Sequence, residues 1–185
     1  TSPNNFLPIL AGTYRFVTTT FAAGDLVLSN NAKTLEMIVV DTTQNNIVLS
    51  YDDGTPNGAG ISWNGGTGGC ANHFIPPFYP CILTSVDAYI LTDPNNVGYT
   101  MFIYKDDGVN GSAGTLIDSI PMLSGTYTPG MYITSYLPTP TQIDSNGFYV
   151  LWDMRGDGIN LGTNITGPYC NRGYEVLGGT WSGYR

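Results

Sequence analysis

The sequence contains few charged residues, and this scarcity excludes several classes of partner. Only 11% of the 185 residues are charged, compared with about 25% in ordinary soluble domains. Six Lys and Arg stand against fourteen Asp and Glu, so the formal net charge is −8. No basic cluster is present to contact nucleic-acid phosphates or anionic lipid headgroups. We therefore expect no nucleic-acid partner.

Long apolar runs and helical periodicity are also missing. No run of about 18 apolar residues occurs, so we expect no membrane insertion. No segment of roughly ten residues free of Gly and Pro places apolar residues at the i, i+3, i+4, i+7 spacing of an amphipathic helix. The sequence therefore predicts a protein with almost no helix.

Motifs that mark catalytic or zinc sites are absent from the sequence. His73 is the only histidine, and neither a G-x-S-x-G nor an H-E-x-x-H motif accompanies it. No pair of carboxylates is singled out for the facing arrangement that a glycosidase requires. The three cysteines form no C-x-x-C pair. We therefore predict no enzyme activity and no required cofactor.

Short runs of β-branched and aromatic residues are present instead, separated by clusters of Gly, Pro, Asn and Asp that favour tight turns. The predicted strands span residues 13–21, 25–29, 34–41, 46–51, 72–75, 81–91, 98–105, 115–120, 131–136, 147–154 and 173–177. About ten short antiparallel strands with frequent turns predict an all-β fold, either a β-sandwich or a jelly roll.

The acidic turn KDDGVNGSAG at residues 105–114 has two interpretations. Asp106, Asp107 and Asn110 offer hard oxygen ligands for Ca²⁺. The twelfth position counted from Asp106 is Ile117 rather than Glu, so the segment is not an EF-hand loop. A hairpin turn, in which Asp and Asn cap backbone groups, explains the same residues and is the favoured interpretation. A calcium site at these three residues stays as the alternative.

Two of the three cysteines flank one loop, CANHFIPPFYPC. Cys70 and Cys81 are therefore predicted to close this loop as a disulfide if the protein resides in an oxidising compartment. Cys170 then stays a thiol or pairs with another chain.

Aromatic residues are the main candidates for contact with a ligand or partner. Trp152 lies inside the apolar stretch GFYVLWDM and is expected in the core. Trp63 and Trp181 are expected in glycine-rich loops and, with Tyr169 and Tyr184, are predicted to contact a ligand or an interface. Flat rings with a polar edge suit both sugar rings and protein surfaces.

Several stretches carry a family resemblance in their order along the chain. They are YDDG (51–54), ISWNGG (61–66), FIPPFYPCILTSVDAYI (74–90), YTMFIYKDDGVNGSAGTLI (99–117), NGFYVLWDM (146–154) and GGTWSGYR (178–185). In this order the segment resembles the accessory β-sandwich module of secreted bacterial surface proteins and proteases. The resemblance implies a jelly-roll-like sandwich with an accessory, non-catalytic role. It also implies a secreted or cell-surface location.

One departure from this resemblance concerns the last strand of the module. Such modules continue past the final Trp into another apolar strand, whereas this chain stops four residues after Trp181. A strand of matching character, TLEMIVVD at residues 34–41, lies near the N-terminus. Its alternate residues Leu35, Met37 and Val39 are the predicted strand donors. The strand either folds back within its own chain or completes the sheet of a neighbouring copy.

We expect residues 1–49 to form an N-terminal strand segment and residues 50–185 the β-sandwich module, together making one structural domain. The predicted function is structural or adhesive, with copies of the chain associating through strand complementation into a polymer or surface assembly. The alternative is a carbohydrate-binding module that holds glycans with exposed Trp and Tyr side chains.

Overall fold

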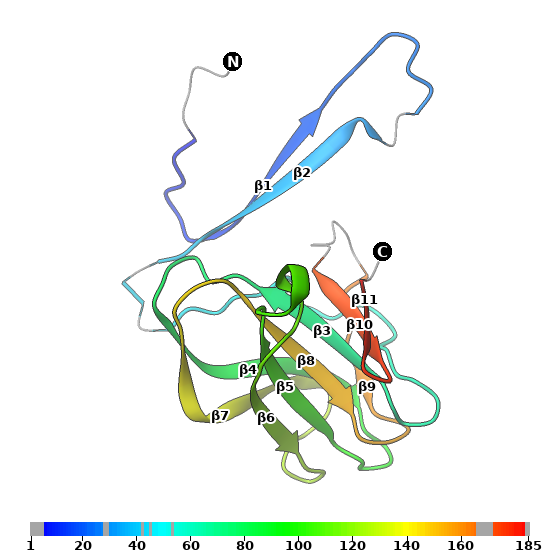
Figure 1. The fold of residues 1–185 in the computed structure, drawn as a ribbon. Helices are drawn as coiled ribbons and strands as arrows, with labels where there is room; N and C mark the ends of the chain where they lie inside the picture. Colours follow the sequence, from blue (N-terminus) through cyan, green and yellow to red (C-terminus); the bar gives the residue numbers. More distant parts are fainter. Residues whose placement is uncertain are drawn as a thin grey trace. The chain divides into compact units, whose positions relative to one another are not determined.

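The computed structural model confirms an all-β fold (Figure 1). It describes residues 6–27, 30–41, 43–44, 46–52, 54–165 and 172–183. The chain divides into two compact units, Thr1–Val48 and Leu49–Arg185. Within the described residues, no helix has the length and apolar character needed to cross a membrane.

The N-terminal unit contains one β-hairpin. Strands β1 (Gly12–Thr19) and β2 (Ala32–Val39) pair antiparallel and form a two-stranded sheet of their own. In the register, Phe16 lies opposite Leu35. An isolated two-stranded hairpin is marginally stable in water, because one ribbon cannot bury its own apolar face.

The C-terminal unit is a sandwich of two antiparallel sheets, one of six strands in the order β11-β10-β3-β8-β5-β6 and one of three in the order β7-β4-β9. In Figure 1, β7 and β4 pass behind β5 and β8. The strands are β3 (Gly69–Phe74), β4 (Cys81–Thr92), β5 (Tyr99–Lys105), β6 (Leu116–Met122), β7 (Met131–Ile143), β8 (Phe148–Met154), β9 (Asn160–Leu161), β10 (Gly173–Leu177) and β11 (Thr180–Gly183). A short 3₁₀ turn, η2 (Val109–Gly111), follows β5.

Several predicted strand boundaries are wrong. No strand forms at residues 46–51 or at the described residues 25–27, although 46–51 contains three successive apolar residues at 47–49. A short apolar run alone does not make a strand, because its backbone groups need a neighbouring strand to pair with. Strands β9 and β11 were not predicted. Strand β7 continues through Pro138 and Pro140, which it tolerates because it is an edge strand of its sheet.

The core lies between the two sheets and is built from alternate residues of their strands. Tyr99 and Ile103 of β5 are 0% exposed, and Trp152 of β8 is 2% exposed, as predicted for this tryptophan. Ile90 of β4 meets them from the opposite sheet and is also fully buried. Burying each large apolar side chain stabilises the fold by about 1.5–3 kcal/mol. The same burial raises the pKa of Tyr99 to about 12.

A buried carboxylate holds the turn between β4 and β5. Asp93 is 8% exposed and accepts hydrogen bonds from the backbone N–H groups of Val97 (3.0 Å) and Gly98 (3.2 Å). The Tyr127 hydroxyl donates a third hydrogen bond to it at 2.6 Å. A buried carboxylate is tolerated only when such donors compensate for lost hydration.

We predict that Asp93→Ala lowers the free energy of unfolding by about 3 kcal/mol, because three donors, one buried and two half-buried, lose their acceptor. Asp93→Asn keeps one acceptor oxygen and should cost less. Urea denaturation with an unchanged m-value provides the measurement. Asp144→Ala, which removes an exposed carboxylate, serves as the control. Equal midpoints for Asp93→Ala and the control would contradict this role of Asp93.

Candidate functional site

One face of the N-terminal hairpin is apolar. Residues opposite one another in an antiparallel pair share a face, and alternate residues along a strand do too. The register therefore places on one face the residues Tyr14, Phe16, Leu35, Met37 and Val39, here called the donor face. The predicted donors of β2 thus lie together. Phe6 packs edge-on against Tyr14 and Phe16, with ring centroids 5.2 and 4.8 Å apart.

The hairpin leaves much apolar surface in contact with solvent. Leu35 is 65% exposed, at the middle of the donor face. Other exposed apolar residues of the N-terminal unit are Phe6, Leu7, Ile9, Leu10, Val17, Phe21, Leu26, Val27 and Val48. Single exposed apolar residues are ordinary, but so many in one small unit make it a candidate for interaction with a partner. The hairpin is therefore the first candidate interaction site.

The second candidate is an unpaired edge in the sandwich. Strand β7 pairs with β4 from Cys81 to Ile90, whereas β9 pairs with β4 only at Ile90 and Thr92. Among the described residues, the segment Cys81–Ala88, here called the β4 edge, therefore lacks a strand partner on the side away from β7. Unpaired backbone groups of this kind are templates for a strand from another chain.

A cavity of about 140 Å³ lies beside the β4 edge. Asn72 and Phe74 of β3 line it on one side, and Asp87 and Ala88 of β4 on the other. Asn72 is exposed although it sits in the middle of β3. Trp152 also lines the cavity, and its buried indole N–H has no acceptor among the described residues. The space between the sheets is therefore incompletely filled here.

Trp181 does not lie in a loop, as the glycine-rich sequence suggested, but in β11. With neighbours on the outside of the six-stranded sheet it forms an outer aromatic face, composed of Phe102, Tyr104, Tyr149, Tyr174 and Trp181. The Trp181 ring is edge-on to Tyr104 and Tyr149, with centroids 5.9 and 5.4 Å away. These contacts leave Trp181 half-buried.

Trp63 packs toward the core instead of into solvent. Its ring lies 6.5 Å from that of Trp152, and its indole N–H donates to Glu175 Oε1 at 2.9 Å. The close approach of the Trp63 ring requires glycine at position 68, since a Cβ there would lie 2.5 Å from the ring. Trp63 and Trp181 therefore lie in different surroundings. Tyr169 and Tyr184, predicted to act with them, lie outside the described residues.

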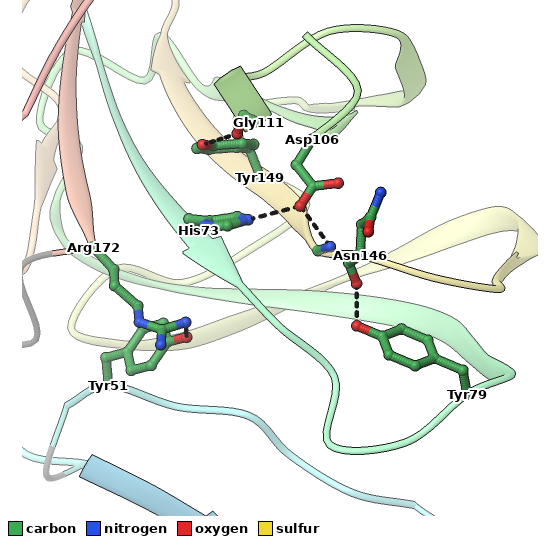
Figure 2. A network of polar contacts seen from close by, with 9 residues as sticks. Tyr51, His73, Tyr79, Asp106, Gly111, Asn146, Tyr149 and Arg172 are labelled. Carbon is green, nitrogen blue, oxygen red and sulfur yellow. Dashed lines mark hydrogen bonds and ion pairs between the residues drawn. The ribbon is translucent and has the colours of Figure 1, made fainter. Parts of the chain in front are cut away.

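The acidic turn takes part in a polar network. Figure 2 shows His73 and Asp106 pointing toward one another, with 3.2 Å between His73 Nε2 and Asp106 Oδ2. The Gly147 N–H donates to the same oxygen at 2.6 Å. The His73 ring stacks on Tyr149, whose hydroxyl donates to the Gly111 carbonyl at 2.8 Å. The network ties the turn after β5 to β3 and β8.

Asp107 is held by a different donor. The Thr115 N–H donates to Asp107 Oδ1 at 2.6 Å, and this hydrogen bond lowers the pKa of Asp107. Asn110 is exposed in η2 and adopts a left-handed backbone with φ of 57°. Within the described residues, no group of three His, Cys, Asp or Glu side chains could hold a metal ion. These contacts favour the turn interpretation, and calcium at Asp106, Asp107 and Asn110 stays a prediction.

The two loop cysteines belong to different sheets. Cys70 lies in β3 and Cys81 begins β4, and no disulfide joins them to each other in this structure. Burial raises the pKa of the Cys81 thiol. Cys170 lies outside the described residues.

Two features of the structure, the outer aromatic face and the β4 edge, are not among the predictions from the sequence. A signal for the first is present in YTMFIYK at residues 99–105, where both alternating sets are apolar or aromatic. A strand with this pattern is expected to be covered on both faces, whereas a two-layer sandwich covers only one face of each sheet. The β4 edge has no comparable signal, because the local sequence does not reveal which strands become neighbours.

Asp153 is a half-buried carboxylate in β8 with no hydrogen-bond donor among the described residues. Burial raises the pKa of Asp153. The folded protein therefore holds this proton more tightly than the unfolded chain, and the stability contributed by this group falls as the pH rises through its folded pKa.

We predict that Asp153→Asn raises the free energy of unfolding at pH 7, because it removes a charge that burial disfavours. The gain should vanish below the ordinary pKa of 3.8, where the wild-type carboxyl is neutral in both states. Urea midpoints at about pH 7 and pH 3 test this. A loss of stability at pH 7, or a gain at both pH values, would contradict it.

Comparisons with protein-family models, with curated proteins and with solved structures found no match to this chain.

Proposed function

We propose that this protein is a non-catalytic, extracellular structural subunit. In this proposal each copy donates its N-terminal hairpin to the sandwich of a neighbour, and the copies form a polymer or a surface assembly. The observation that carries the proposal is the donor face, which is apolar, regular in its alternation and centred on the exposed Leu35.

The energetics favour a partner for this face. Covering one large apolar side chain contributes about 1.5–3 kcal/mol. Association itself costs roughly 4–15 kcal/mol in lost translational and rotational freedom. A single contact is therefore insufficient, whereas several side chains of the donor face buried together, with added backbone hydrogen bonds, can exceed the cost.

The two surfaces also determine the kind of assembly. The donor face lies in the N-terminal unit and the unpaired strand edge in the sandwich, so each copy carries one donor and one acceptor. A contact between different surfaces is heterologous, and it propagates into a filament unless its geometry closes a ring. The low charge content assists close packing of copies, since little like-charge repulsion opposes it.

A second candidate function is glycan binding on the outer aromatic face. Asp153 lies in β8 near Tyr104. Burial is the largest cause that raises the pKa of Tyr104, and the charge of Asp153 raises it further. A carboxylate without donors beside aromatic rings suits a sugar, whose hydroxyls donate hydrogen bonds and whose apolar face stacks. Titration of tryptophan fluorescence with soluble glycans, using Trp181→Phe for comparison, separates this function from assembly. A response that requires Trp181 supports it, and no response opposes it.

We predict that Leu35→Asp abolishes assembly, because it places a charge at the centre of the donor face. The matched control is Thr34→Asp, which adds the same charge to the same strand on the opposite face. Light scattering and electron microscopy of the full chain are the measurements. Wild type and Thr34→Asp should form filaments or large oligomers, and Leu35→Asp should be monomeric. A monomeric wild type, or equal assembly by both variants, would sink the proposal.

A further inference from the structure

We infer that the acceptor is the β4 edge together with the adjoining cavity, and that strand β2 of a second copy occupies it. The inference rests on the proposed function and specifies where the donated hairpin binds. In the assembled state β2 pairs with β4 along its outer edge, while β1 continues the sheet beyond β2. The donor face then covers the inner face of β3.

The unequal sizes of the two sheets support this location. Three strands cannot cover the inner face of six, and the exposed side chain of Asn72 marks the uncovered part on β3. Two strands added beside β4 convert the small sheet into one that matches the larger sheet more closely. Two sheets in a sandwich bury their inner faces against each other, so this addition completes the core.

Other strand edges in the described sandwich are less suitable. Strand β7 contains Pro138 and Pro140, and β6 contains Pro121, and each of these prolines removes one backbone N–H donor from its strand. Proline on an edge strand is a common device against strand addition. Strand β11 has only 4 residues. The β4 edge, with the sequence CILTSVDA, contains no proline and runs for about the 8 residues of β2.

The cavity provides space for the side chains of the donor face. Alternate residues of an added strand point toward the opposite sheet. Leu35, Met37 and Val39 would therefore enter the space beside Asn72 and contact Trp152. A backbone carbonyl of the entering strand can accept from the Trp152 indole N–H, which has no acceptor among the described residues.

The distribution of charge favours a copy of the same chain as the occupant. Asp52 and Asp87 line the cavity. Arg15 and Lys33, two of the six cationic residues, lie in the hairpin. Lys33 precedes Leu35 by two residues and lies on the same face of β2, so it approaches the acidic cavity when the donor face docks.

The first test is hydrogen exchange on wild-type protein in the assembled state and in monomer obtained by Leu35→Asp. Amides of residues 82–88 in β4 should exchange at least about tenfold more slowly in the assembly. Amides of β6 and of residues 131–143 in β7 should exchange at nearly the same rate in the assembly and in the monomer. Protection of β6 or β7 with none in β4 would overturn the inference while leaving hairpin donation intact.

The second test fills the cavity. Asn72→Trp places a large side chain in the cavity that the donor face would occupy, and it should leave the protein folded but monomeric. Ser119→Trp, on the exposed outer side of β6, is the matched control and should assemble normally. Near-wild-type urea midpoints check the folding of both variants.

The outcomes separate the two proposals. If Leu35→Asp blocks assembly and Asn72→Trp does not, hairpin donation holds and the β4 acceptor is wrong. If neither variant blocks assembly, both proposals fail. If both block it and the β4 amides gain protection, both are supported.

Discussion

The unequal size of the two sheets is the constraint on which the rest of the sandwich depends. Three strands face six, so part of the inner surface of the larger sheet has no strand opposite it. The glycine-rich loop with Trp63 covers one part of this surface, through contacts with Trp152 and Glu175. The cavity beside the β4 edge occupies another part. The incompletely filled core, the unpaired β4 edge and the candidate acceptor therefore all result from the unequal number of strands in the two sheets.

Within the described residues, the N-terminal hairpin has an apolar face that no second layer covers. A two-stranded ribbon satisfies the backbone groups between its strands but has no layer behind it. Its apolar side chains consequently remain half-buried or exposed, as Leu35 does. Covering such an apolar surface removes it from water and lowers the free energy. The hairpin thus has an uncovered apolar face, and the sandwich has an unpaired strand edge beside a cavity.

Comparison of prediction with structure separates local from non-local information. The run GFYVLWDM forms β8 with Trp152 in the core, because a buried strand is apolar along its whole length. The three successive apolar residues at 47–49 also predict a strand, yet no strand forms at 46–51. The glycine-rich sequence around Trp181 predicts a loop, whereas this residue lies in β11, where Val176 of β10 is its partner in the register. Pairing partners decide such cases, because a strand forms only where another strand is in place to pair with it.

The sequence by itself determined the fold class and many of the turns, because composition and period-two alternation are local properties of the chain. It also determined which residues of β2 share a face, since alternation assigns Leu35, Met37 and Val39 together. Only the tertiary structure decided that β3 and β4 leave an uncovered cavity, that His73 meets Asp106, and that Trp181 packs among tyrosines. Each of these depends on which strands become neighbours, a choice made by the burial of the whole core.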